Sequence, residues 1–168
     1  MRDQKKRIVI APDSFKGTMT AIEVCRIIRK AFLQVDSALE ICCLPMADGG
    51  EGTLDAFLSA LGGERKTVRV HGPLFAMHNA SFGILKDGTA ILEMAAAAGL
   101  PLAGKDANPM YTTTFGVGEL IRAALDAGCR KIRVGAGGSA TTDGGIGCLT
   151  ALGARFTDKT GEEVPPMG

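Results

Sequence analysis

Two loops of this sequence have the same order of residues, and each lies between an apolar run and a helical pattern. Residues 48–52 read Asp-Gly-Gly-Glu-Gly, and residues 143–147 read Asp-Gly-Gly-Ile-Gly. Capping a helix needs one polar residue, and glycine is a poor helix former. Glycines do let backbone N–H groups approach an anion at the start of a helix. We therefore expect these loops to bind phosphate.

The elements around the first of these loops alternate between strand and helix. Residues 7–11 are a β-branched run, and residues 21–35 have apolar positions at helical intervals after a capping-box pair. Residues 39–44 indicate a second strand, and residues 54–61 a second helix. Two such units in succession predict an α/β fold with a mostly parallel sheet and flanking helices.

The pattern changes after Gly63. Residues 79–85 and 89–94 flank an Asp-Gly turn, which indicates a β-hairpin and a partly antiparallel sheet. We place a domain boundary near this change. Residues 1–66 are then the N-terminal part of a first α/β domain, and residues 67–168 are an incomplete second α/β domain that carries the "GGSATTDGG" loop.

The alternation of strand and helix returns beyond the hairpin. We expect a helix over residues 117–125, a strand over residues 131–136, and a further helix after the second acid-glycine loop. A strand is expected at residues 154–158, followed by a turn at residues 159–163. The last residues, "VPPMG", are either a frayed tail or the point where a larger fold is interrupted.

Composition and charge favour a small partner molecule. The chain has 19 basic and 18 acidic side chains, so it offers no field that would attract nucleic acid or an anionic membrane. No apolar run reaches membrane-spanning length, and the N-terminus lacks a secretory signal, so we expect a cytoplasmic protein. Five cysteines without a C-x-x-C pair favour reduced thiols over zinc. We expect His71 and His78 to lie outside the site. The oligomeric state stays open.

The loops that follow strands carry the candidate site residues, because ligands of open parallel sheets bind outside the carboxyl ends of the strands. A carboxylate beside a phosphate repels it unless a cation such as Mg²⁺ lies between them. Phosphoryl transfer needs a phosphate nest, a divalent ion, a Lys or Arg, and an acid that accepts a proton. Lys16 suits the charge role, Asp48 or Asp143 the metal or base role, and residues 135–139 the nest. The other loop candidates are Asp13, Ser14 and Glu51.

Structural roles are open for the same residues. Asp48 or Asp143 alone would be read as a helix cap or turn former, and their shared arrangement gives the functional reading about equal weight. If both act in catalysis, replacement by Asn should lower turnover far more than folding stability. Glu93 lies in an apolar strand and is either an edge-facing residue or a site acid.

Five stretches of the chain, in order, resemble the glycerate kinase family. They are "IVIAPDSFKGTMTA", "LPMADGGEGT", "AILEMAAAAGLPL", "TTTFGVGELI" with "AALDAG", and "GAGGSATTDGGIGCLTALGARF". The resemblance implies transfer of the ATP γ-phosphate to D-glycerate with Mg²⁺, giving phosphoglycerate, with 2-phosphoglycerate as the expected product. It also implies a flavodoxin-like first domain with a second α/β domain inserted into it. At matching positions it places these residues around the substrates: Asp13, Lys16, Asp48, Glu51, Glu93, Gly137, Gly138, Ser139 and Asp143.

Two other functions are compatible with parts of the sequence. Gly135, Gly137 and Ala140 fit G-x-G-x-x-A after a strand, with Asp158 at a distance suited to a ribose, as in a dinucleotide-binding dehydrogenase module. Members of the glycerate kinase family are also much longer than 168 residues. A non-catalytic remnant is therefore the second alternative, and the activity of this chain alone is in question.

Overall fold

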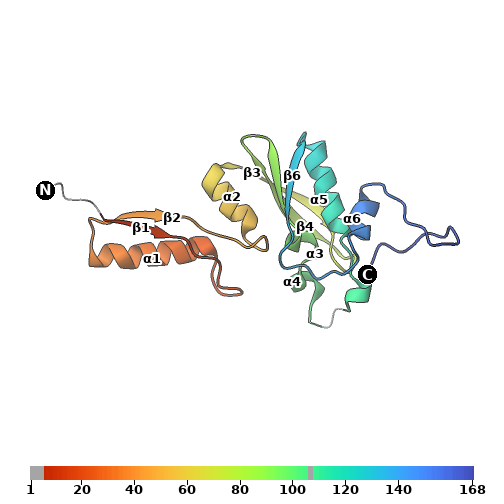
Figure 1. Cartoon of the computed structure of the whole chain (residues 1–168), viewed down its shortest axis with the longest axis horizontal. Coiled ribbons are helices and arrows are strands. Elements are labelled where there is room, and N and C mark those ends of the chain that lie inside the picture. Colours follow the sequence, from red (N-terminus) through yellow and green to blue (C-terminus); the bar gives the residue numbers. More distant parts are fainter. Residues whose placement is uncertain (1–5, 106–107) are drawn as a thin grey trace.

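The computed structural model describes residues 6–105 and 108–168. Its N-terminal lobe contains the parallel strands β1 (Arg7–Ile10) and β2 (Glu40–Cys43), joined by helix α1 (Ala21–Val35) (Figure 1). The expected capping box begins α1: Thr20 Oγ1 accepts a hydrogen bond from Glu23 N at 3.2 Å, and Glu23 Oε2 accepts one from Thr20 N at 2.9 Å. The first strand–loop–helix unit is thereby confirmed.

The second lobe is built on a four-stranded mixed sheet in the order β3-β4-β5-β6. Strand β3 (Gly63–His71) is antiparallel to β4 (Met77–Leu85), which is antiparallel to β5 (Thr89–Glu93). Strand β6 (Lys131–Gly135) is parallel to β5. The expected hairpin and the α/β class are confirmed, and the large sheet is mixed.

Helices cover both faces of this sheet (Figure 1). On one face α2 (Thr53–Leu61) packs Leu54 against Leu85 and Ile91. On the other, α5 (Phe115–Asp126) packs Val117 and Leu120 against a larger apolar core that includes Ala90 and Leu92. Successive strand residues point to opposite faces, so β5 contributes to both cores. Helix α6 (Ile146–Ala151) packs on α5, and the short helices are α3 (Ala95–Ala98), α4 (Leu100–Ala103) and the 3₁₀ helix η1 (Pro109–Tyr111).

The expected division between residues 66 and 67 falls inside β3, which runs unbroken across it. Helix α2 belongs by its contacts to the four-stranded sheet. The packing therefore changes earlier, in the segment between β2 and α2, because the apolar stripe of α2 pairs with residues that come later in the chain. The assignment of two domains stays a prediction.

The C-terminal segment differs from expectation. The strand expected at residues 154–158 is wrong: the region forms only an isolated bridge between Thr157 and Glu163. The turn that follows is confirmed, with Asp158 Oδ1 accepting a hydrogen bond from Thr160 N at 2.7 Å. The last residues are not frayed, because Gly168 N donates to Thr112 O at 3.1 Å. Among the helices of residues 6–105 and 108–168, none has the length and apolar character to cross a membrane.

Candidate active site

A cavity of about 810 Å³ lies between the two lobes. The N-terminal lobe contributes the loop after β1 and the start of α1. The second lobe contributes the loop before α2, the first turn of α2, the start of β4, the end of β5, the segment with α3 and α4, and Gly138 of the loop after β6. Loops that follow strands β1, β2 and β5 thus meet at one place, as expected for α/β folds.

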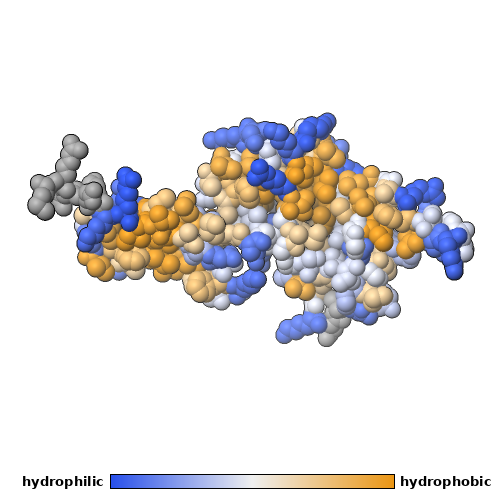
Figure 2. Space-filling model, in the orientation of Figure 1, coloured by the Kyte–Doolittle hydropathy of each residue, from blue (hydrophilic) through white to orange (hydrophobic). Residues whose placement is uncertain are grey.

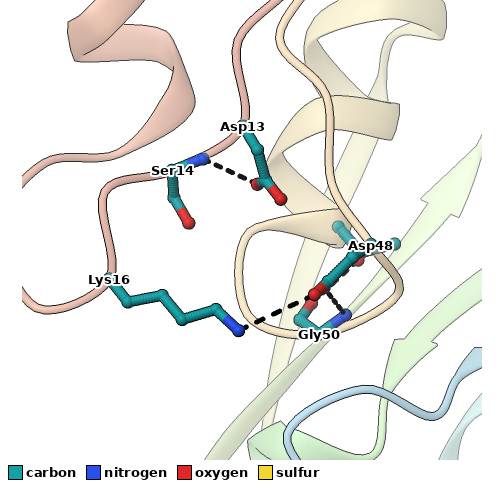
Figure 3. Close-up of polar contacts among 6 residues, drawn as sticks. Asp13, Ser14, Lys16, Asp48 and Gly50 are labelled. Atoms are coloured by element: carbon teal, nitrogen blue, oxygen red, sulfur yellow. Dashed lines mark hydrogen bonds and ion pairs between the residues drawn. The ribbon is translucent and has the colours of Figure 1, made fainter.

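Lys16 and Asp48 face each other across this cavity (Figure 3). Lys16 Nζ lies 3.8 Å from Asp48 Oδ2, and the two side chains are 86% and 56% exposed. An ion pair this exposed contributes only about 0–1 kcal/mol to stability, so both groups can exchange this contact for a ligand. In the same loop as Lys16, Asp13 Oδ1 accepts a hydrogen bond from Ser14 N at 2.6 Å.

The loop around Asp48 requires glycine for two physical reasons. Gly49 and Gly52 have φ of +93° and +94°, a region that other residues rarely adopt, and Asp48 Oδ1 accepts from Gly50 N at 2.9 Å to close an Asx turn. In addition, Gly49 O accepts from Gly137 N at 3.0 Å. A Cβ on Gly137 would lie 2.5 Å from Gly50 N. The two glycine-rich loops therefore touch backbone to backbone.

Glu93 ends β5 and lies at the boundary between the sheet and the cavity. It is 9% exposed, and its Oε1 accepts a hydrogen bond from Leu54 N at 2.7 Å. Burial raises the pKa of this carboxyl above its ordinary value, an effect that the hydrogen bond from Leu54 partly opposes. Glu93 is thus both a cavity residue and a cap for α2.

Asp143 occupies a different environment from Asp48. It is 5% exposed, and its Oδ2 accepts hydrogen bonds from Thr114 N at 2.8 Å, Thr114 Oγ1 at 2.7 Å and Gly147 N at 3.1 Å. Its Oδ1 accepts from Gly145 N at 3.0 Å. This carboxylate joins the N-terminal ends of α5 and α6, and Asp143 is not among the residues that line the cavity.

The cavity brings together most of the residues expected from the sequence, although their catalytic and binding roles stay predictions. Gly137, Ser139 and Asp143 lie outside its lining; Ser139 Oγ instead lies 2.9 Å from Thr141 Oγ1. The expected residues that line it are Asp13, Ser14, Lys16, Asp48, Glu51, Glu93 and Gly138.

Sequence reasoning missed His78 and Asn79 at the start of β4, both of which line the cavity. His78 Nε2 is buried and has no hydrogen-bond partner among the described residues. His71 lies outside the cavity lining, with Nδ1 2.9 Å from Glu119 Oε1. His78 reaches the lining because the start of β4 lies at the cavity, and no spacing in the sequence indicates that.

Among the described residues, carboxylates are the negatively charged oxygen ligands that the cavity offers to Mg²⁺. In the part of the chain that the structure describes, no group of three or more His, Cys, Asp or Glu side chains is gathered closely enough to hold a metal ion. Asp48 Oδ2 keeps lone pairs available, because its contact with Lys16 is longer than a hydrogen bond. Mg²⁺ is commonly held by one or two carboxylates together with substrate phosphates, and Asp48 fits that mode.

The geometry does not favour a dinucleotide site after β6. In that fingerprint the glycine loop opens directly into a helix whose N-terminus receives the pyrophosphate, whereas α6 begins only at Ile146. A Cβ on Gly135 would lie 2.4 Å from Gly49 O, so this glycine serves a contact between loops. Asp158 lies in the exposed turn at residues 158–162.

The glycerate kinase family model matches residues 8–168, which include both lobes and all the loops around the cavity. The chain belongs to the glycerate kinase family. It is 48% identical over 164 residues to a glycerate kinase of Bacillus subtilis, covering 96% of this chain and 43% of the relative. It is 47% identical over 160 residues to the glycerate 2-kinase of Escherichia coli K12, covering 94% of this chain and 42% of the relative.

A solved structure shows the same fold. A crystal structure described as a glycerate kinase 2 from Salmonella typhimurium LT2 matches with a TM-score of 0.82 and 45% sequence identity. The match covers 97% of this chain and 44% of that one. The chain therefore spans less than half the length of the relatives it matches.

Proposed function

We propose that this chain provides the phosphate-handling part of an ATP-dependent kinase that phosphorylates D-glycerate. The observation that carries the proposal is the cavity between the lobes, where Lys16 of one lobe faces Asp48 of the other in a member of the glycerate kinase family. A lysine opposite a carboxylate supplies one group for the transferring phosphoryl and one for its metal ion.

The charges around the cavity explain why a cation is needed. Among the residues that the structure describes, one lysine, Lys16, lines it together with six carboxylates, and both ATP and glycerate are anions. Mg²⁺ bound between Asp48 and the phosphates would neutralise charge that otherwise repels the nucleotide. The six acids are Asp13, Glu23, Asp48, Glu51, Asp55 and Glu93.

The residues divide into distinct roles under this proposal. Lys16 pairs with the phosphoryl oxygens as charge develops, and a cavity carboxylate accepts the proton of the attacking hydroxyl. Asp48 is the metal ligand. Asp143 was an equal candidate from the sequence, but four hydrogen bonds occupy its oxygens. We assign it the structural task of holding α5 and α6 together.

The same proposal includes the acceptor hydroxyl, the product and the cellular location. The relative in Escherichia coli is named glycerate 2-kinase, which supports the 2-hydroxyl as acceptor and 2-phosphoglycerate as product. A cytoplasmic location follows from the expected substrates.

Calorimetric titration with Mg²⁺-ATP and, separately, with NAD⁺ tests the proposal. We expect saturable Mg²⁺-ATP binding that Lys16→Ala weakens by about tenfold, since one charge-assisted contact is lost. Lys66→Ala is the matched control, because Lys66 pairs with Glu64 on β3 outside the cavity. Binding of NAD⁺ alone would support the dehydrogenase module, and binding of neither nucleotide would support the remnant. A coupled assay for phosphoglycerate then tests the acceptor.

A further inference from the structure

Helix α2 has no cap of its own. Its N-cap is Gly52, which has no side chain, and the first N–H groups of any helix need partners from outside the helix. Thr53 N donates to Gly50 O at 3.2 Å, within the preceding turn. Leu54 N donates to Glu93 Oε1, which comes from a strand 39 residues further along the chain.

Glu93 is well placed to hold this helix still. All five residues of β5 are buried, so the backbone that carries Glu93 is fixed within the sheet. The side chain of Leu54 packs in turn against Leu85 and Ile91, and a Cβ on Gly83 would lie 2.4 Å from Leu54 Cδ1. The start of α2 is therefore tied to the sheet by one hydrogen bond and one apolar contact.

A short series of contacts joins this anchor to the cavity. Thr53 Oγ1 donates to Gly50 O at 2.8 Å, and Gly50 N donates to Asp48 Oδ1 at 2.9 Å. Any shift of the first turn of α2 would move Gly50 and, with it, the carboxylate of Asp48. In the described residues Glu93 forms no ion pair, and its carboxylate instead accepts the hydrogen bond from Leu54 N at the start of α2.

The geometry points to Glu93 as a positioning residue: by accepting the Leu54 N–H it fixes the first turn of α2, and through Gly50 it sets the direction of Asp48. The link to catalysis rests on the proposed function, whereas the effect on the loop does not. This role differs from direct binding of substrate, because it needs an acceptor oxygen at the correct reach and does not need the charge.

Two conservative variants separate reach from charge. Glu93→Gln keeps the length and one acceptor oxygen but removes the charge, whereas Glu93→Asp keeps the charge but is one methylene shorter. Ile91→Val is the matched control, since it trims the apolar contact with α2 on the same strand and leaves the hydrogen bond intact. The measurements are amide hydrogen exchange by NMR and Mg²⁺-ATP affinity by calorimetry on the whole chain.

We expect Glu93→Asp to speed exchange of the Leu54 and Gly50 amides about tenfold and to weaken Mg²⁺-ATP binding by a similar factor, since the shorter side chain does not reach Leu54 N and that hydrogen bond is lost. Glu93→Gln should stay within about threefold of the unsubstituted chain in both measurements. Ile91→Val should lower the unfolding midpoint without selectively affecting the Gly50 amide.

The opposite ranking would overturn the inference. If Glu93→Gln loses nucleotide affinity while Glu93→Asp keeps it, the charge acts on the ligand directly. Unchanged exchange at Gly50 in both variants would also reject the positioning role. Should the unsubstituted chain bind no Mg²⁺-ATP, the proposed function fails, but exchange at Leu54 and Gly50 still decides whether Glu93 holds the loop.

Discussion

Asp48 and Asp143 begin the same kind of turn, yet their carboxylates have different tasks. Each accepts a hydrogen bond from the N–H group two residues later, as the shared Asp-Gly-Gly order requires. The remaining oxygen of Asp48 faces Lys16 in the cavity, whereas that of Asp143 accepts three further bonds inside the protein. At the scale of single residues, the partner of the second oxygen separates a candidate metal ligand from a structural acid.

Asparagine substitutions measure this difference. Asp143→Asn should lower the free energy of unfolding by about 2–3 kcal/mol, because an amide N–H₂ cannot accept the bonds that converge on Asp143. Asp48→Asn should change it by less than about 1 kcal/mol, since Asp48 is exposed. Urea unfolding monitored by circular dichroism provides both values. Equal losses in the free energy of unfolding would contradict the assignment and would indicate that both aspartates act as structural caps.

The buried carboxyl of Glu93 predicts a pH dependence. Burial raises its pKa above the ordinary 4.5, with Asp55 raising it further and Arg65 opposing. Between these two pKa values the native state binds more protons than the unfolded state, so this carboxyl's contribution to stability falls as pH rises. Urea unfolding from pH 4 upwards should therefore show Glu93→Gln gaining stability relative to the unsubstituted chain. A difference that stays constant with pH would contradict this prediction.

At the scale of structural elements, the two glycine-rich loops pack directly against each other. The loop before α2 and the loop after β6 are locked by Gly49, Gly50 and Gly137, whose backbones approach more closely than side chains would allow. Close backbone packing of this kind fixes the two loops relative to each other, so under the proposed function they would need little reorganisation when a phosphate binds. The glycines thus serve loop packing as well as the turns themselves.

Alanine substitution at this contact provides a direct check. Gly137→Ala should destabilise the chain by about 1–3 kcal/mol, because its Cβ would lie 2.5 Å from Gly50 N and 2.8 Å from Gly50 Cα, and the backbone must move. Gly50→Ala is the comparison. The atom nearest to its added Cβ would be Asp48 Oδ1 at 3.0 Å, which belongs to an exposed side chain and not to the backbone, so Gly50→Ala should lose less stability. Unfolding midpoints in urea rank the two, and the reverse order would argue against the close contact.

The two lobes differ in how much apolar surface they bury. Of its described residues, the N-terminal lobe buries the apolar side chains of Ile10, Val24 and Cys25 only, while Val9 and Val35 remain 62% and 87% exposed. Figure 2 shows apolar residues over much of this lobe's visible surface. Two-stranded sheets are marginally stable by themselves, so whole-molecule stability depends on the four-stranded sheet and its two helical layers.

Hydrogen exchange should reveal this imbalance. We expect amides of β1, β2 and α1 to exchange at least about tenfold faster than those of β4, β5 and α5, because fewer buried contacts oppose their opening. NMR or mass spectrometry at neutral pH measures both groups in one sample, with the exposed turn at residues 159–161 as the fast reference. Equal protection of the two lobes would mean that they open as one cooperative unit.

Features made by neighbouring residues were predictable from the sequence. The Thr20–Glu23 capping box, the turn at Asp87 and Gly88, and the helical stripes of α2 and α5 all depend on contacts within a few positions. The strand expected at residues 154–158 did not form, because an apolar alternation becomes a strand only where a partner edge is available.

The sequence by itself determined the alternation of strand and helix, the hairpin, and the two acid-glycine turns, because hydrogen bonds and side-chain periodicity over a few residues specify them. Only the tertiary structure decided that Asp48 faces the cavity while Asp143 is buried, that His78 reaches the lining, and that Glu93 caps α2. Those outcomes depend on contacts between strands and loops that are far apart in the chain. The orientation of each of these side chains is set only when the helices and loops pack against the sheet.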